Sequence, residues 1–190
     1  MRIIVLGSGN WGTTLSIIFS QKNDVVLWTI NSEEARIINE KRENIFYLPG
    51  IKLPDNMVIE EKFSSPIAED DILILAVPSR KIESVAAELK ANGFDKGIVI
   101  NVSKGVKHST LKTISEIITE AFPGVRFANL TGPTISREIA EGLPAKAILA
   151  SRDLALLFHL QDVLENPLLK FEFSRDVEGV ELAASLKGII

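Results

Sequence analysis

The sequence predicts an α/β fold whose core is a doubly wound, mainly parallel β-sheet. Short runs of β-branched and other apolar residues recur along the chain, and stretches with the character of helices separate them. The runs are apolar throughout, which is typical of strands that helices cover on both faces. Because strands and helices alternate, the strands are expected to join one sheet through right-handed crossovers.

Six strands and four helices stand out most clearly in this pattern. The predicted strands are residues 3–6, 25–28, 72–77, 98–102, 127–130 and 147–150. The predicted helices are residues 11–21, 32–42, 80–91 and 110–121. One long loop, residues 44–56, is punctuated by Pro49, Gly50 and Pro54. With 190 residues, 46% of them hydrophobic, the chain can form one compact domain, which we expect to span residues 1–175.

The composition excludes several classes of function. Against 25 acidic residues the chain has 21 Lys and Arg, a formal charge of −4, and so lacks the cationic surplus that binds nucleic acids or anionic membranes. The absence of cysteine excludes disulfides and zinc–thiolate sites, and His108 and His159 are too few for most metal sites. The apolar start of the chain is too short for a signal peptide or a membrane span. We therefore expect a cytoplasmic protein without a metal site.

A glycine-rich turn joins the first predicted strand to the first predicted helix. Its sequence has the GxGxxG spacing of the Rossmann dinucleotide-binding fold and reads Gly7-Ser8-Gly9-Asn10-Trp11-Gly12. In this pattern the first glycine permits a tight turn, the second lets the backbone approach a pyrophosphate, and the third allows close helix–strand packing. The start of the helix adds free N–H groups and the positive end of its dipole. The alternative is a turn that only connects strand to helix, but such a turn does not require three glycines at this spacing.

The end of the second predicted strand bears on the choice between NAD and NADP. In this fold an Asp or Glu that binds the ribose of NAD is expected about 20 residues after the glycines. The strand ends in Thr29-Ile30-Asn31, with neither an acid nor the Arg that would favour the 2′-phosphate of NADP. Glu33 and Glu34 come slightly later and are interpreted as first-turn residues of the next helix. The choice stays open, with a slight preference for NAD because a cationic partner is absent.

The last stretch of the sequence differs in kind from the rest. Residues 177–190 are predicted as a helix that carries one apolar stripe, formed by Leu182, Leu186, Ile189 and Ile190. No capping Gly or Asn closes this helix, which ends on two isoleucines. We interpret residues 176–190 as the start of a carboxyl-terminal, all-helical domain that the sequence does not contain.

Several segments together resemble one enzyme family. They are Asn10-Trp11-Gly12, Tyr47-Leu48-Pro49-Gly50 within the long loop, Val77-Pro78-Ser79 after the third strand, Ser103-Lys104-Gly105, Thr131-Gly132-Pro133-Thr134, and Gly179-Val180-Glu181 ahead of Lys187. Over essentially the whole chain they resemble the bacterial NAD(P)-dependent glycerol-3-phosphate dehydrogenases. The loop with Tyr47 is the most specific of these segments.

The resemblance implies reversible hydride transfer between NAD(P)H and dihydroxyacetone phosphate, giving sn-glycerol 3-phosphate for phospholipid synthesis. It implies a coenzyme site that adds Ile30, Pro78, Lys104 and Ser136 to the six residues of the glycine-rich turn. It implies that Lys104, Gly132 and Thr134 contact a small phosphorylated triose, and that Lys187 is the proton acceptor in alcohol oxidation. It also implies a homodimer for the full-length protein.

The sequence departs from the family pattern at two of these segments. Ser136 stands where the family has alanine, and Gly188 replaces the asparagine that follows the catalytic lysine. The carboxyl-terminal domain of the family, which completes the substrate site, is absent, so the 190 residues alone are expected to be inactive.

Other interpretations of the same residues stay open. Lys104 and Lys187 read equally as solvated surface lysines when the family pattern is set aside. The chain could be a related hydroxyacid or ketopantoate-type reductase, although the loop with Tyr47 has no place in those enzymes. It could also be a non-catalytic module that senses NAD(P), since the fold alone does not decide function.

Overall fold

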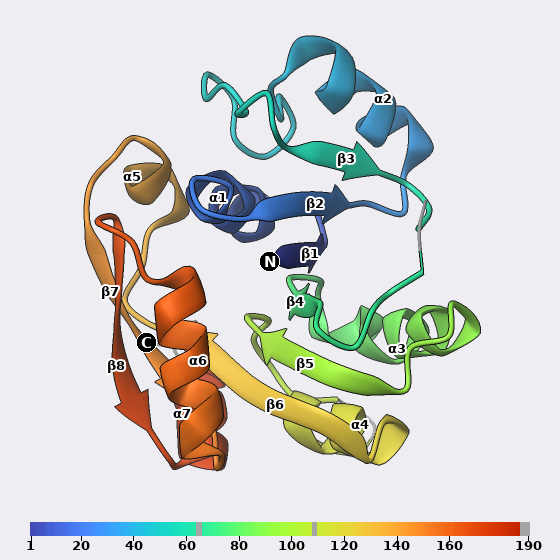
Figure 1. Ribbon diagram of the computed structural model, residues 1–190, viewed down its shortest axis with the longest axis vertical. Coiled ribbons are helices and arrows are strands. Elements are labelled where there is room, and N and C mark those ends of the chain that lie inside the picture. The colour runs from blue at the N-terminus through green and yellow to red at the C-terminus, as the bar shows by residue number, and fades with distance from the viewer. Residues whose placement is uncertain (64–65, 108–109, 187–190) are drawn as a thin grey trace.

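The computed structural model describes residues 1–63, 66–107 and 110–186, and these form one eight-stranded sheet with helices on both faces (Figure 1). The strands lie in the order β3-β2-β1-β4-β5-β6-β7-β8. Neighbouring strands are parallel except β6 and β7, which are antiparallel. The strands are β1 (Arg2–Leu6), β2 (Asp24–Trp28), β3 (Val58–Glu60), β4 (Ile72–Leu75), β5 (Lys96–Asn101), β6 (Gly124–Thr131), β7 (Ala145–Ala150) and β8 (Leu169–Ser174).

The described residues form seven α-helices and one 3₁₀ turn, of which α7 follows the last strand. The helices are α1 (Asn10–Phe19), α2 (Ser32–Lys41), α3 (Ile82–Ala91), α4 (Ile114–Ala121), α5 (Ser136–Ala140), α6 (Leu154–Leu164) and α7 (Val177–Leu186). The 3₁₀ turn (Ser79–Lys81) runs directly into α3. Among the described residues, every helix is too short or too polar to span a lipid bilayer.

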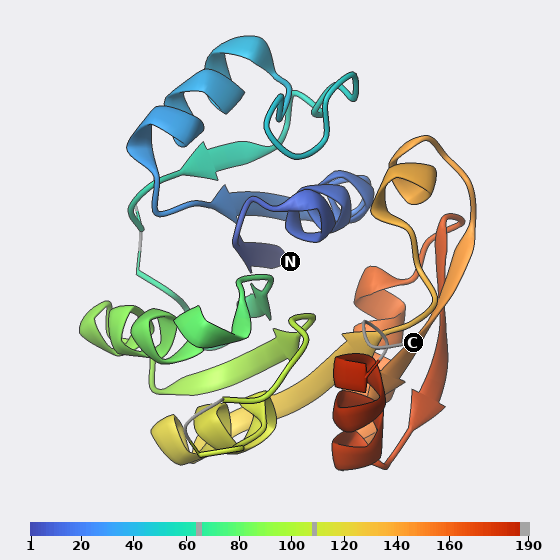
Figure 2. The ribbon, with the colours of Figure 1, turned by 180° about the vertical axis from the view of Figure 1, so that it is seen from behind.

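The core has two halves because the central strands send alternate side chains to opposite faces of the sheet. Ile3 and Val5 of β1 pack with residues of α1, α2 and α6 on one face. Ile4 and Leu6 pack with residues of α3 and α4 on the other face. These two helices lie side by side (Figure 2). All four side chains are at most 2% exposed. The apolar runs in the sequence therefore correspond to strands that helices cover on both sides.

The predicted strands and helices are confirmed, with changes at their edges. Each of the six predicted strands is present, but β3 and β8 were not predicted from the sequence. β3 has only three residues, and β8 alternates buried and exposed side chains because it lies at the edge of the sheet. The prediction of a mainly parallel sheet is confirmed. The pair β6 and β7 is antiparallel, because these strands are joined through α5 without a crossover.

The start of α4 also differs from the prediction, which placed it at residue 110. Leu111 has a φ of +57°, which is incompatible with a helix, and the helix begins only after Thr113. The Thr113 side chain and Glu116 form a capping box that satisfies free N–H groups at the start of the helix.

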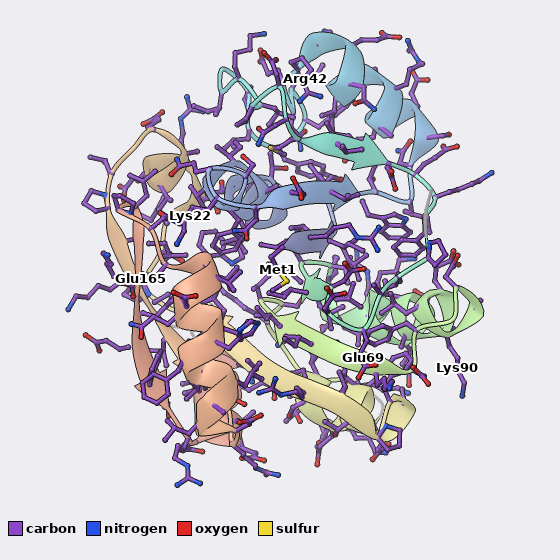
Figure 3. All side chains as sticks on the ribbon, viewed as in Figure 1. Met1, Lys22, Arg42, Glu69, Lys90 and Glu165 are labelled. Atoms are coloured by element: carbon purple, nitrogen blue, oxygen red, sulfur yellow. The ribbon has the colours of Figure 1, made fainter. Side chains whose placement is uncertain are left out.

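The long loop between α2 and β3 is anchored rather than loose. Arg42, labelled in Figure 3, adopts a left-handed conformation at the end of α2. Its guanidinium donates to the Met57 carbonyl at 2.9 Å. Leu48 and Leu53 are at most 4% exposed. The loop therefore contributes to the hydrophobic interior as well as to the surface.

The described part of α7 packs against the sheet through Val177, Glu181 and Ala184. Glu181 is only 3% exposed, and its carboxylate accepts hydrogen bonds from the backbone N–H groups of Ile114 and Ser115 at 2.8 and 3.1 Å. It also accepts from the Ser115 hydroxyl at 2.7 Å. These hydrogen bonds join α7 to α4 through a single side chain. The dipole of α4 also favours a negative charge at this end of the helix.

We expect Glu181→Ala to lower the free energy of unfolding by about 2–4 kcal/mol, because it leaves two buried N–H groups without an acceptor. Glu181→Gln keeps one acceptor oxygen and is expected to lose less. The measurement is urea denaturation of both variants, with Glu178→Ala as the control. Glu178 pairs with Arg152 at the surface of the same helix, and its loss is expected to cost no more than about 1 kcal/mol. An unfolding midpoint of Glu181→Ala equal to that of the control would contradict this account.

Candidate functional site

The glycine-rich turn, called here the fingerprint loop (residues 7–12), lies between β1 and α1. Gly7 has a φ of +119°, and a Cβ atom there would lie 2.5 Å from the Ala76 carbonyl oxygen. A Cβ atom on Gly12 would lie 2.0 Å from the Gly7 carbonyl oxygen. Both positions therefore require glycine for the fold itself, because α1 passes very close to the end of β1 and to the chain after β4.

Gly9 is different, because apart from its chain neighbours no described residue comes within 4 Å of the place where its Cβ would be. Its φ of −65° and ψ of 179° are open to any residue. The conformation and the packing of the protein thus give no reason for glycine at this position. A bare backbone that faces open space is what a closely approaching ligand requires.

The start of α1 favours an anionic ligand. The first N–H groups of a helix have no partner within the helix, and they carry the positive end of its dipole. The N-cap residue is Gly9, which has no side chain to accept a hydrogen bond from these N–H groups. The first turn of α1 also contains no acidic side chain. These N–H groups are thus available to a phosphate group, whose charge the helix end stabilises.

The fingerprint loop is held in place by Asn44, which sequence reasoning did not single out as a functional residue. Asn44 is fully buried, and its side-chain amide donates to the Ser8 carbonyl at 2.7 Å and to the Thr13 hydroxyl at 2.8 Å. Its side-chain oxygen accepts from the N–H groups of Phe46 and Tyr47. Asn44 therefore joins the long loop to the fingerprint loop.

A crevice of about 360 Å³ opens in front of α1, at the carboxyl ends of β1, β4, β5 and β6. The strand order changes direction between β1 and β4, and ligands of open α/β sheets bind at such a point. The residues predicted from the sequence that line the crevice are Gly9, Asn10, Trp11, Pro78, Lys104, Gly132, Thr134 and Ser136. The fold thus brings together residues that are up to 127 positions apart in the chain, from Gly9 to Ser136.

The other predicted site residues lie outside this crevice. Gly7, Ser8 and Gly12 belong to the fingerprint loop behind it, and Ile30 follows β2 with 83% of its surface exposed. Lys187, the predicted proton acceptor, lies outside the described residues, as do Gly188 and His108.

Lys104 projects from the loop that follows β5. Asn101, at the end of β5, is buried and hydrogen-bonds across the strands to the side chain of Asn129 at 2.8 Å. Its side-chain oxygen accepts from the Ser103 N–H at 3.0 Å, and the N–H of Gly105 donates to the Ser185 hydroxyl of α7 at 3.0 Å. Lys104, which is exposed, is thereby flanked by two fixed residues, and α7 takes part in holding its loop.

Gly132 and Ser136 lie on the segment between β6 and α5. A Cβ atom on Gly132 would lie 2.9 Å from the Ala147 Cα, so the close pairing with β7 already requires glycine there. The Ser136 carbonyl accepts a hydrogen bond from the Thr14 hydroxyl at 3.1 Å, which joins α5 to α1. The backbone of this segment is therefore fixed against the wall of the crevice.

The part of the chain that the structure describes contains no group of three or more His, Asp or Glu side chains placed to hold a metal ion. The charged and polar side chains that line the crevice are Asn10, Ser103, Lys104, Thr131, Thr134 and Ser136.

The sheet order, the fingerprint loop and the crevice have the form of a Rossmann-type dinucleotide-binding domain. Residues 2–157 match the family described as the N-terminus of NAD-dependent glycerol-3-phosphate dehydrogenase. The chain belongs to this family.

Individual relatives agree with this assignment. The glycerol-3-phosphate dehydrogenase [NAD(P)+] of Fusobacterium nucleatum is 34% identical over 193 residues, which cover all of this chain and 58% of the relative. The corresponding enzyme of Wolbachia pipientis is 36% identical over 190 residues. The crystal structure of glycerol-3-phosphate dehydrogenase from Coxiella burnetii superposes with a TM-score of 0.90 at 26% identity, covering 99% of this chain and 58% of that one. The chain thus spans somewhat more than half the length of these relatives.

We expect the three fingerprint glycines to differ in their effect on stability. Gly12→Val should lower the free energy of unfolding by about 3 kcal/mol or more, because its side chain would overlap the Gly7 carbonyl. Gly9→Val should cost no more than about 1 kcal/mol, since its side chain would enter open space at an N-cap. Urea denaturation measures both values. Equal losses in the two variants would show that Gly9 is also required by the fold.

Proposed function

We propose that this chain binds NAD(H) or NADP(H) in the crevice and is the coenzyme-binding part of an enzyme that interconverts dihydroxyacetone phosphate and sn-glycerol 3-phosphate. The observation that carries the proposal is Gly9, whose bare backbone faces the crevice beside the free end of α1. The fold does not explain this glycine, whereas the approach of a coenzyme pyrophosphate does. The family membership supplies the substrate, since relatives of this chain are named for glycerol 3-phosphate.

The residues present fit a dinucleotide. In this proposal the N–H groups at the start of α1 bind the pyrophosphate, Asn10 and Trp11 border the coenzyme, and Ile30 lies against its adenosine end. Pro78 and Ser136 line the crevice where the nicotinamide half lies. The nicotinamide ring, when bound, supplies or accepts the hydride.

The substrate side of the proposal depends on Lys104, Gly132 and Thr134, which line the same crevice. The ammonium group of Lys104 orients the phosphorylated triose beside the coenzyme. Lys187 takes the proton when the alcohol is oxidised and returns it in the reverse direction. The hydroxyl of Ser185, two residues before Lys187 in the sequence, accepts a hydrogen bond from the Gly105 N–H, and this contact of α7 with the loop of Lys104 supports the proposed role.

The extent of the domain is part of the same proposal. β8 ends at Ser174, and we infer that residues 1–175 form the dinucleotide-binding domain and that residues 176–190 begin the next one. Leu182 and Leu186 of α7 are 48% and 55% exposed, so their side chains face away from the sheet. The remaining length of the relatives is the natural candidate to cover them. We also infer a homodimeric, cytoplasmic enzyme for the whole protein.

The ketopantoate-type alternative is supported only at the level of the fold. A probable 2-dehydropantoate 2-reductase from Bacillus subtilis superposes with a TM-score of 0.69 at 16% identity. Similarity of this kind extends to several dehydrogenases and does not select a substrate. The long loop with Asn44 and Tyr47, within the matched residues 2–157, favours glycerol 3-phosphate.

The coenzyme proposal is tested by titrating the 190-residue chain with NADH and following the coenzyme fluorescence. We expect saturable binding, and we expect Gly9→Val to abolish it while the variant stays folded, because the valine side chain would occupy the pyrophosphate position. Gly93→Asn is a control for a glycine distant from the fingerprint loop, because asparagine tolerates the left-handed φ of +83° at that position. Unchanged binding in Gly9→Val would refute the assignment of the fingerprint loop to the pyrophosphate.

The roles of the two lysines are tested by turnover of dihydroxyacetone phosphate in the full-length gene product. We expect Lys104→Ala to lower kcat/KM for dihydroxyacetone phosphate while NADH affinity changes little. Lys187→Ala should lower kcat by about 10²- to 10⁴-fold, the usual contribution of a general acid or base. Lys107→Ala is the matched control, because Lys107 lies on the same loop but pairs with Glu83. A kcat/KM equal to that of the unmodified enzyme would exclude the lysine concerned from the mechanism.

A further inference from the structure

Two neighbouring acidic side chains in the first turn of α2 make different contacts. Glu33 forms an ion pair with Arg36 on the same helix, at 2.7 Å. The carboxylate of Glu34 instead points away from α2 and accepts a hydrogen bond from the hydroxyl of Ser8, in the fingerprint loop. The sequence-based interpretation of both residues as first-turn residues is therefore incomplete for Glu34, whose carboxylate belongs to the surroundings of the fingerprint loop.

The local sequence Asn31-Ser32-Glu33-Glu34 resembles a capping box, yet only half of the box forms. The Asn31 side chain accepts from the Glu34 N–H at 3.2 Å, as an N-cap residue does. The Asn31 N–H, however, donates to the Thr29 hydroxyl at 3.3 Å instead of to Glu34. In α4, by contrast, the box is complete, because Glu116 accepts from the Thr113 N–H at 2.8 Å. The Glu34 carboxylate is thus not needed to cap its own helix.

Glu34 lies beside the position where the adenosine ribose binds in this fold. The Gly7 N–H donates to the Trp28 carbonyl at 2.9 Å, which ties the fingerprint loop to the end of β2. In Rossmann domains the ribose next to the adenine lies between these two segments, and an acidic residue from the end of the second strand binds its hydroxyls. Here the end of β2 has no acid, and Glu34 brings a carboxylate to the same place from the first turn of α2.

The charge around Glu34 opposes a second phosphate at this ribose. One carboxylate oxygen, Oε1, is engaged by Ser8, and the other, Oε2, has no hydrogen-bond partner among the described residues. Arg36 is held by Glu33 and Glu40. Lys62 borders a separate hollow on α2 and β3, together with Arg36 and Glu61. A 2′-phosphate beside Ser8 would therefore meet an uncompensated carboxylate.

We propose that Glu34 makes this chain selective for NAD over NADP. Its carboxylate accepts a hydrogen bond from the 2′-hydroxyl of NAD and repels the 2′-phosphate of NADP. Repulsion of the competing ligand is a common source of specificity, and it is strong for like charges within about 4 Å. This inference rests on the proposed coenzyme site and determines which of the two coenzymes that site accepts.

The test measures dissociation constants for NADH and NADPH on the unmodified 190-residue chain and on Glu34→Gln, by coenzyme fluorescence at constant ionic strength. We expect the unmodified chain to bind NADH at least about tenfold more tightly than NADPH, since a tenfold ratio needs only about 1.4 kcal/mol. In Glu34→Gln the ratio should fall to within about threefold, mainly because NADPH binds more tightly once the charge is removed.

Glu33→Gln is the matched control, because it removes the same charge from the adjacent position, where the carboxylate faces Arg36 instead of Ser8. Its NADH to NADPH ratio should equal that of the unmodified chain. Lys62→Ala should also leave NADPH affinity unchanged. A ratio that falls equally in both Gln variants would show a general effect of net charge and would overturn the assignment to Glu34.

Two further outcomes separate this inference from the proposed function. Equal affinity of the unmodified chain for NADH and NADPH, or a preference for NADPH, would overturn the role of Glu34 and leave the coenzyme site intact. Failure of both coenzymes to bind would overturn the proposed coenzyme site and the role of Glu34 with it.

Discussion

The close approach of α1 to the end of β1 is the constraint on which the rest of the site depends. A Cβ atom on Gly12 would lie 2.0 Å from the Gly7 carbonyl oxygen, so the helix and the strand can approach this closely only with glycine at position 12. The contact aims the start of α1 at the ends of β1 and β4. Since the strand order reverses between these two strands, the free N–H groups of the helix point into the crevice that the reversal opens.

Buried amide side chains then hold the loops around this crevice. Asn44 joins the long loop to the fingerprint loop, and the pair Asn101 and Asn129 joins the ends of β5 and β6. Asn129 also donates to the Val177 carbonyl at the start of α7, and Glu181 of that helix binds the start of α4. Amide side chains can hold buried loops in this way because each supplies hydrogen-bond donors and an acceptor and carries no charge to desolvate. The loop geometry therefore depends on buried hydrogen bonds as much as on apolar packing.

The sequence was sufficient for the fold class, the central strands and most residues of the crevice. Apolar runs such as residues 72–75 have no other plausible place than the middle of a covered sheet, and the fingerprint spacing locates one end of the site. It was insufficient where tertiary contacts override local pattern. β8 alternates polar and apolar residues because it is an edge strand, and the left-handed backbone of Leu111 delays the start of α4 to residue 114. The hydrogen-bond partner of Glu34 could not be predicted either. A carboxylate is favourable in the first turn of a helix whether it binds its own helix or another segment.

The residues around the crevice separate into those that the fold requires and those that it does not. Gly7, Gly12 and Gly132 are glycines for steric reasons within the protein. Gly9 has no such reason, exposed Ile30 is 83% accessible, and the Glu34 carboxylate is not used to cap its own helix. An apolar side chain in water and a carboxylate turned away from its helix each contribute little to folding stability. One coenzyme, bound as proposed with its pyrophosphate at Gly9 and its adenosine ribose at Glu34, would account for all three of these features.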